Sequence, residues 1–103
     1  MKRIVYTKRG GLEAIEIIDE KSPEPGNNEV MIEVHRAGIN FADLMMRQGL
    51  YGAAPDFPFT PGYEVSGVIR AIGSDVERHN VGDRVVALTG FGGYAEQVVV
   101  SEE

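Results

Sequence analysis

The chain has 103 residues, of which 43% are hydrophobic and 25% are charged, and its formal net charge is −6. This length and composition predict one globular domain, residues 1–103. The acidic balance argues against a nucleic-acid partner, which needs a clustered basic surface. Without cysteine the chain has neither disulfides nor thiolate metal ligands. No window is long or apolar enough for membrane insertion, and residues 1–20 do not resemble a signal peptide, so we expect a cytoplasmic protein.

Short apolar runs between glycine and proline turns predict a chain built mainly of β-strands. Apolar and polar residues alternate over residues 30–36, which is typical of a strand with two different faces. Ser66 and Gly67 are small residues inside an apolar run, and they predict a bulge or a close approach of the backbone. Strands are expected at residues 4–6, 12–19, 30–36, 63–72, 81–87 and 94–100. The residues alone therefore indicate a small β-barrel or sandwich.

One segment, residues 41–48, has helical composition. Its apolar residues recur at helical spacing, and Gly49 is placed to end it. Asn40 comes directly before it and is suited to cap the first turn, because its side-chain carbonyl can accept a hydrogen bond from a helix amide. Asp43 lies in the first turn, where it either stabilises the helix dipole or pairs with Arg47. We therefore predict one short helix that joins the preceding strand at Asn40.

The run Gly90–Gly93 begins a stretch with the glycine spacing of a dinucleotide-binding fingerprint. That fingerprint must follow a strand and open a helix, with an acidic residue about 20 positions later. The residues at 97–100 are strand-like instead, and the sequence ends at Glu103. We therefore interpret the run as a hairpin turn and expect no nucleotide site in it.

Four stretches in a fixed order carry a family resemblance. They read AGINFADLMMRQGLY from Ala37, PGYEVSGVIRAIG from Pro61, VGDRVVAL from Val81 and GGYAEQ from Gly92. Together they resemble the N-terminal GroES-like catalytic domain of the medium-chain dehydrogenase/reductase superfamily. The greatest likeness is to its zinc-independent quinone oxidoreductase branch, which includes proteins of the VAT-1 type. The resemblance covers nearly the whole chain and implies a mainly β fold, a GroES-like, partly open barrel with one short helix near residues 41–48.

The resemblance also bears on metal binding, since many members of this superfamily hold a catalytic zinc. In those members a cysteine stands at the position of Asn40 and a histidine at that of Tyr63. Neither an amide nor a phenol is a usual zinc ligand. His35 and His79 have no second candidate ligand paired with them in the sequence. We therefore expect no metal.

Asn40 and Tyr51 are the residues that the resemblance places beside the substrate. It implies that Asn40 lines the pocket on the nicotinamide side, where its amide could hold a carbonyl oxygen that gains negative charge during hydride transfer. It implies that Tyr51 is a hydrogen-bond donor to the substrate. The residues alone favour a helix cap for Asn40 and a loop aromatic packed on the barrel for Tyr51.

The turn Pro61–Glu64 is expected to face the Asn40 segment and to form another wall of the pocket. Tyr63 takes the position of the lost histidine and is expected to shape the same cavity. Glu64 opens an otherwise apolar strand, so it is either buried with a partner or turned toward the pocket. In the zinc-binding relatives the matching glutamate lies near the metal, and without a metal a structural role is favoured for Glu64.

The function that the resemblance implies is the substrate-side half of an NADPH-dependent, zinc-free reductase of quinones or other α,β-unsaturated carbonyls. In that family the cofactor is bound mainly by a Rossmann domain that follows this one, and such a domain is absent from residues 1–103. We therefore expect the chain by itself to be an inactive, monomeric piece of a longer enzyme that forms homodimers.

Two alternatives belong to other functional classes. One is a non-enzymatic GroES-like binding module such as a co-chaperonin, which needs a long, mobile, glycine-rich loop. The loop at 22–28 is short, and the loop at 50–62 is rich in proline and aromatic residues. The other alternative is a VAT-1-like protein with a membrane-associated role, against which the acidic charge and the lack of a basic amphipathic helix argue.

Overall fold

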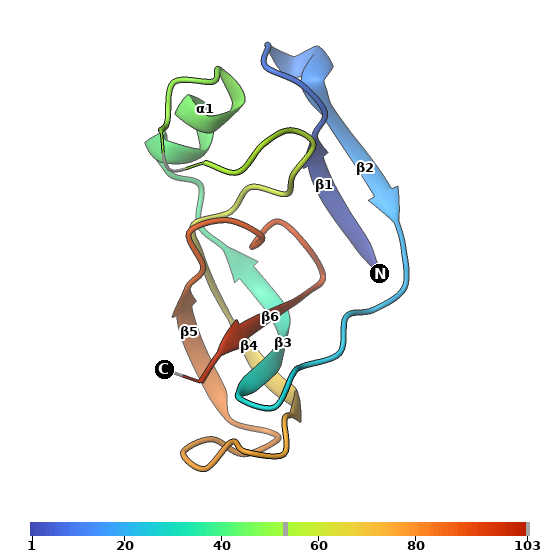
Figure 1. Cartoon of the computed structure of the whole chain (residues 1–103), viewed down its shortest axis with the longest axis vertical. Helices are drawn as coiled ribbons and strands as arrows, with labels where there is room; N and C mark the ends of the chain where they lie inside the picture. The colour runs from blue at the N-terminus through green and yellow to red at the C-terminus, as the bar shows by residue number, and fades with distance from the viewer. Residues whose placement is uncertain (53, 103) are drawn as a thin grey trace.

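The computed structural model describes residues 1–52 and 54–102, and in this part of the chain strands predominate (Figure 1). The elements in order are β1 (Lys2–Tyr6), a turn of 3-10 helix η1 (Leu12–Ala14), β2 (Ile15–Asp19), β3 (Glu29–Ala37), α1 (Phe41–Arg47), β4 (Glu64–Ile72), β5 (Arg84–Leu88) and β6 (Gln97–Ser101). The prediction of a mainly β chain with one short α-helix is confirmed.

The start of the second strand differs from the prediction. The chain does not extend from residue 12, because the Ala14 amide donates to the Gly11 carbonyl at 3.0 Å and closes a 3-10 turn. Glu13 supports this turn, since its Oε1 accepts the Gly11 amide at 3.1 Å. The strand therefore begins only at Ile15.

The strands form two antiparallel sheets, neither of which closes on itself. One sheet pairs β1 with β2, and the other has the order β5-β4-β3-β6. Figure 1 shows the two-stranded sheet along one side of the molecule, with α1 next to the turn between its strands. The sheets are joined where β1 meets the segment before β6, since the Ile4 amide donates to the Tyr94 carbonyl at 2.8 Å and the Glu96 amide to the Lys2 carbonyl at 3.0 Å. This arrangement agrees with a partly open GroES-like barrel.

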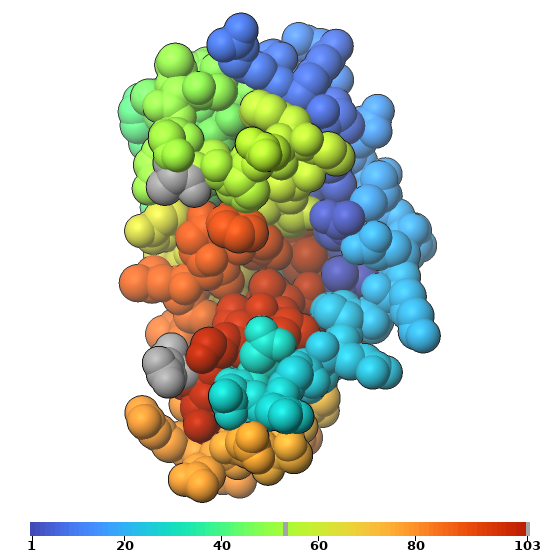
Figure 2. All heavy atoms as spheres, in the orientation of Figure 1, coloured from blue at the N-terminus to red at the C-terminus, as the bar shows by residue number. Residues whose placement is uncertain are grey.

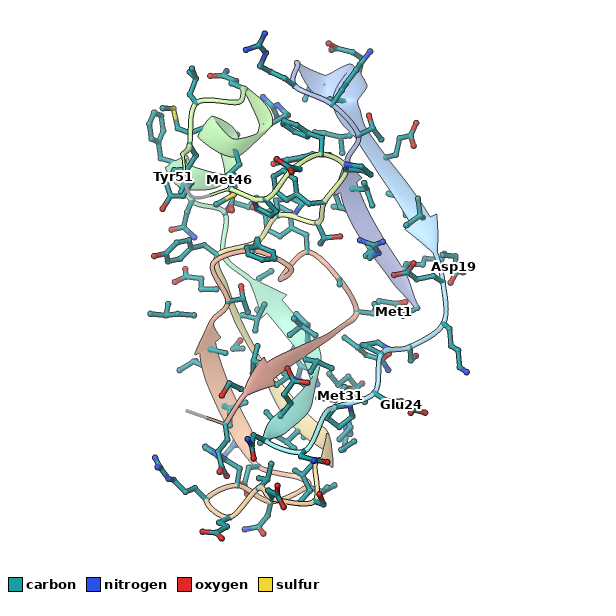
Figure 3. The ribbon with its side chains drawn as sticks, in the orientation of Figure 1. Met1, Asp19, Glu24, Met31, Met46 and Tyr51 are labelled. Carbon is teal, nitrogen blue, oxygen red and sulfur yellow. The ribbon has the colours of Figure 1, made fainter. Side chains whose placement is uncertain are left out.

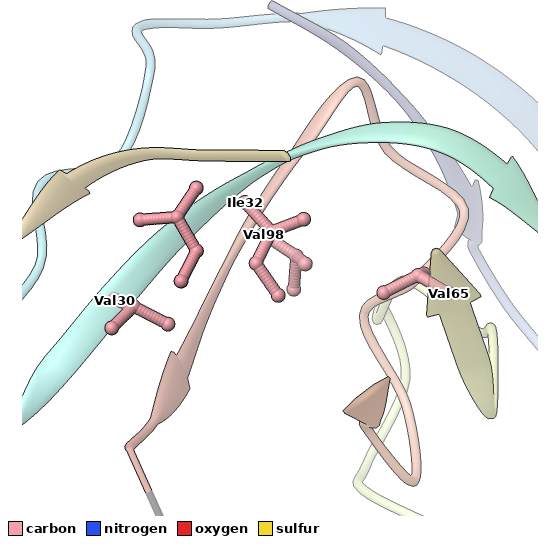
Figure 4. Packing of buried hydrophobic residues seen from close by; sticks show 5 residues of the cluster. Val30, Ile32, Val65 and Val98 are labelled. Atoms are coloured by element: carbon pink, nitrogen blue, oxygen red, sulfur yellow. The ribbon is translucent and has the colours of Figure 1, made fainter. Parts of the chain in front are cut away.

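The larger sheet encloses a core of aliphatic side chains (Figure 4). The buried members are Val30, Ile32, Val65, Ile69 and Val98. In each strand these residues are separated by an even number of positions, so they lie on one face of the sheet. Burying a side chain of this size stabilises the fold by about 1.5–3 kcal/mol. Burial of this face therefore helps to hold β3, β4 and β6 together.

A second core cluster attaches α1 to the rest of the molecule. It consists of Tyr6 from β1, Met46 from α1 and Phe59 from the loop before β4. The rings of Tyr6 and Phe59 meet edge to face, with centroids 5.7 Å apart and planes at 78°. The short helix is held against β1 by this packing.

The run Gly90–Gly93 is not a hairpin turn, although the expectation that it opens no helix is confirmed. Its flanking strands β5 and β6 lie at opposite edges of the sheet, so the run is part of a connection that crosses from one edge to the other. It lies against the end of the loop before β4, because Gly92 donates its amide to the Thr60 carbonyl at 2.7 Å and Tyr94 to the Pro61 carbonyl at 2.9 Å. Figure 2 shows the two segments side by side on the surface.

Candidate functional site

The candidate site begins where β3 turns into α1. Asn40 has extended backbone angles, φ −116° and ψ 157°, and is the N-cap of the helix. Its backbone carbonyl accepts the Asp43 amide at 3.0 Å, and its own amide donates to Asp43 Oδ2, also at 3.0 Å. This is a capping box, in which a side chain of the first turn satisfies the amide before the helix. Asn40 therefore occupies the capping position that the sequence predicted.

Asp43 is the hydrogen-bonding centre of this region and is only 1% exposed. Besides the Asn40 amide, its carboxylate accepts the Gly62 amide on Oδ1 at 3.3 Å and the Tyr94 hydroxyl on Oδ2 at 2.7 Å. The alternative pairing of Asp43 with Arg47 does not occur, since Arg47 Nε donates to the Gly10 carbonyl at 3.3 Å. Three segments that lie far apart in the sequence therefore meet at one buried carboxylate.

Two phenols near this carboxylate are held in the protonated form. Burial raises the pKa of Tyr94 far above its usual value, and the hydrogen bond to Asp43 and the negative charge of Asp43 add to this effect. Burial likewise raises the pKa of Tyr6, with a further contribution from Asp43. Tyr94 therefore remains a hydrogen-bond donor to Asp43 at every physiological pH.

The side-chain nitrogen of Asn40 is in a different situation. Nδ2 is buried and has no hydrogen-bond partner among the described residues. A buried N–H group without a partner costs free energy, so such groups are rare in native proteins and call for an explanation. A ligand oxygen is one partner that would satisfy this donor.

The turn Pro61–Glu64 faces the Asn40 segment, as expected. Asp43 holds the Gly62 amide, and the Gly38 amide donates to the Glu64 carbonyl at 3.2 Å. Tyr63 is half-buried, and its carbonyl accepts the Thr89 amide at 2.7 Å.

Glu64 itself is exposed, so it is not buried with a partner, and that Glu64 faces the pocket of Asn40 and Tyr63 stays a prediction. A Cβ on Gly38 would overlap Oε1 of the Glu64 side chain, so the Glu64 carboxylate lies directly against this glycine. Glu64 lines a groove of about 500 Å³ at β4 and β5, together with Arg36, Gly38, Val65, Ser66, Val86, Ala87 and Leu88. Asn40, Tyr51 and Tyr63 are not part of that lining.

Tyr51 follows α1 and packs at the edge of the cluster of Tyr6, Met46 and Phe59. Figure 3 shows it close to Met46 at the helix. The contact found is the loop-aromatic packing that the residues alone favoured. The structure therefore brings Asn40 and the Pro61–Glu64 turn together through Asp43, while Tyr51 packs on the cluster of Tyr6, Met46 and Phe59.

The sequence did not reveal the central position of Asp43 or the part played by Tyr94. An acidic residue three positions after an asparagine is itself a capping-box pattern, so one of the three hydrogen bonds had a local signal. The other two join residues 19 and 51 positions apart, and no local pattern predicts them.

Other kinds of site have limited support in the described residues. Among them, no three histidine, aspartate or glutamate side chains come together as a metal site would require. His79 Nδ1 lies 3.6 Å from Glu102 Oε2, and His35 is exposed on β3. No helix in the described part of the chain has the length and apolar character to cross a bilayer.

Comparison with known proteins assigns the chain to a family. Residues 26–103 match the family described as the alcohol dehydrogenase GroES-like domain. The chain belongs to this family. The GroES-like domain is 44% identical over 101 residues to the synaptic vesicle membrane protein VAT-1 homolog of Danio rerio, covering 97% of this chain and 21% of that protein. It is 44% identical over 103 residues to the quinone oxidoreductase of Pseudomonas aeruginosa, covering 99% of this chain and 31% of that protein.

Solved structures agree with this assignment. The GroES-like domain superposes on the human VAT-1 homolog-like protein with a TM-score of 0.93 at 38% identity, over 98% of this chain and 32% of that one. It superposes on Escherichia coli quinone oxidoreductase complexed with NADPH with a TM-score of 0.91 at 34% identity, over 98% and 31%. The resemblance to the quinone oxidoreductase and VAT-1 branch of the medium-chain dehydrogenases/reductases is confirmed. The chain spans at most about a third of the length of these relatives.

Proposed function

We propose that this GroES-like domain forms the substrate side of an NADPH-dependent, zinc-free reductase of quinones or other α,β-unsaturated carbonyls. Its relatives include quinone oxidoreductases, one of them solved with NADPH. The observation in the chain itself that supports the proposal is the buried, unpartnered Nδ2 of Asn40 at the strand–helix junction. This donor is suited to an oxygen atom of a bound ligand.

The proposed chemistry gives this donor a role in the transition state. When a hydride is added to a conjugated carbonyl, negative charge develops on the carbonyl oxygen. A fixed N–H group aimed at that oxygen stabilises the charge, and removing one such donor typically lowers kcat by about 10²–10³-fold. Asn40 is suited to this task because both of its backbone polar groups are held by Asp43. Tyr51 and Tyr63 are the proposed phenol contacts to the substrate, and Glu64 borders the groove that begins at Gly38.

NADPH would supply the hydride, and this chain would contact it mainly through Asn40. An orphaned amide donor fits the carboxamide-bearing nicotinamide end of the cofactor. The glycine run at 90–93 leads into strand β6 and not into a helix, so it lacks the geometry that cradles a pyrophosphate. Most of the cofactor would therefore be held by a separate nucleotide-binding domain. No zinc is proposed, because Asn40 and Tyr63 stand where the superfamily's zinc ligands would stand and neither is a usual ligand.

The proposal is tested in a fusion in which this chain replaces the matching segment of the Pseudomonas aeruginosa quinone oxidoreductase. We expect the fusion to oxidise NADPH with 1,4-benzoquinone and to keep its activity after dialysis against EDTA. The isolated chain should not oxidise NADPH. Asn40→Ala should lower kcat of the fusion by about 10²-fold or more. Asn28→Ala, on an exposed turn, is the matched control and should leave kcat unchanged.

Two results would reject the proposal. One is a folded fusion that binds NADPH but reduces neither quinones nor enones. The other is an Asn40→Ala variant with the same kcat as the Asn28→Ala control.

A further inference from the structure

The burial of Asp43 requires an explanation that goes beyond helix capping. A carboxylate that is 1% exposed has lost its hydration, and this costs several kcal/mol unless the charge is compensated. No ion pair among the described residues includes Asp43. Its compensation consists of three neutral donors: two backbone amides and one phenol. An apolar side chain in the same space would avoid this cost but would leave the Asn40 and Gly62 amides and the Tyr94 hydroxyl without this acceptor, so the carboxylate serves to fix an arrangement.

The arrangement that it fixes includes both walls of the candidate site, which are the strand–helix junction at Asn40 and the turn Pro61–Glu64. Oδ2 accepts the Asn40 amide, and Oδ1 accepts the amide of Gly62, which directly precedes Tyr63 and Glu64. The Tyr94 hydroxyl donates to Oδ2 as well. A Cβ on Gly62 would overlap the backbone at Tyr94, so the turn and the Tyr94 segment are in direct contact. Neither wall can move without breaking a hydrogen bond to Asp43.

The same bonds determine what the Asn40 side chain is free to do. Asp43 satisfies the backbone amide of Asn40, and the Asn40 backbone carbonyl satisfies the amide of Asp43. Asn40 Nδ2 is left buried without a protein partner. We infer that Asp43 is a positioning residue that anchors the junction and the Pro61–Glu64 turn and so holds the Asn40 carboxamide ready to donate to a ligand oxygen. The ligand part of this inference rests on the proposed function.

A first experiment follows the isolated chain by ¹H–¹⁵N NMR and needs no activity. Asp43→Asn keeps the shape of the side chain but places an NH₂ group against at least one of the three donors. Tyr94→Phe removes only the hydroxyl donor to Asp43, and this variant replaces Asp43→Asn in the comparison if Asp43→Asn does not fold. Both variants should shift the side-chain amide of Asn40 and the backbone amide of Gly62. The control Asp56→Asn should shift neither, because Asp56 is exposed and makes no hydrogen bond or ion pair to the described residues.

A second experiment separates positioning from a purely structural role, using the fusion enzyme. Misplacing a group by about 1 Å can cost about 10²-fold in rate. Asp43→Asn should therefore lower kcat by about 10- to 10²-fold with a smaller change in KM. If Asp43 acts through Asn40, the same substitution in the Asn40→Ala background should lower kcat by less than about threefold.

The outcomes distinguish this inference from the proposed function. An inactive wild-type fusion would reject the proposed function, and the NMR comparison would still decide the role of Asp43. A folded Asp43→Asn chain with unchanged Asn40 and Gly62 amides would overturn the inference. So would an equal loss of kcat in both backgrounds, since it would mean that Asp43 acts independently of Asn40.

Discussion

Gly67 lies where strands β3 and β4 approach so closely that no side chain fits. A Cβ at this position would overlap the carbonyl oxygen of Glu33 on the neighbouring strand. The pairing of the two strands also shifts between Val34 and Arg36, opposite Gly67. Both outcomes that the small residues at 66 and 67 predicted, a bulge and a close backbone approach, are thus present at one point.

Gly67→Ala should destabilise the protein, because the obstacle is backbone and cannot turn away. Overpacking of this kind typically costs about 1–3 kcal/mol in the free energy of unfolding. Urea denaturation of the isolated chain measures this cost. Gly52→Ala is the matched control, since a Cβ there meets nothing within 4 Å. A Gly67→Ala chain as stable as Gly52→Ala would show that β3 can move aside.

At the scale of elements, α1 depends on packing for its existence. It has seven residues, and isolated helices shorter than about 12–15 residues are marginal in water. Its buried apolar side chain is Met46, at 2% exposure, which packs against Tyr6 and Phe59. Asp43 is the other buried residue of the helix, and its carboxylate accepts three hydrogen bonds. The helix is therefore fixed at two points, one apolar and one polar.

Met46→Ala should remove the packing of α1 against Tyr6 and Phe59 and lower the free energy of unfolding by about 2–5 kcal/mol. The control is Leu44→Ala in the same helix, because Leu44 is 39% exposed and its truncation leaves no cavity. Urea denaturation gives both values, and we expect Leu44→Ala to cost less than about 1 kcal/mol. Equal costs for the two variants would contradict the packing argument.

Sequence patterns predicted the elements better than their arrangement. Alternation of apolar residues located β3, which has one buried face, and an apolar run located β4. The connection through Gly90–Gly93 was misinterpreted because glycine turns look alike whether they join neighbouring strands or cross a sheet. For the site, the capping role of Asn40 was local and predictable. The bonds of Asp43 to Gly62 and Tyr94 were not, because they depend on how distant segments pack.

At the scale of the whole molecule, the first and the last described residues, Met1 and Glu102, are both tied into the fold. The terminal amino group of Met1 lies 3.3 Å from Asp19 Oδ1, and Figure 3 shows the two residues near each other, where β1 starts and β2 ends. At the other end, Glu102 follows β6 and its amide donates to the Asn28 carbonyl at 2.9 Å. Its carboxylate accepts the Arg78 amide at 2.7 Å and the Glu77 amide at 2.9 Å. Glu102 thus connects β6 with the loop between β4 and β5.

This connection makes part of the stability depend on pH. The hydrogen bond from the Arg78 amide is the main cause that lowers the pKa of Glu102, and the Glu77 amide and His79 add to it. Because the folded-state pKa lies below the unfolded value of about 4.3, the stabilisation is fully present above that pH and is lost as the pH falls through the folded-state pKa. Acid should therefore loosen the attachment of β6.

Glu102→Gln should remove this part of the pH dependence. It lowers the free energy of unfolding at pH 7, and the difference from wild type should shrink as the pH falls from about 4.3 toward the folded-state pKa. Glu24→Gln is the control, since Glu24 lies on the exposed loop after β2 and should behave as wild type at every pH (Figure 3). Urea denaturation at pH 7 and at pH 3 measures both variants. A constant difference between wild type and Glu102→Gln across that range would mean that the stability lost does not depend on ionisation of Glu102, and that its charge has no part in holding β6.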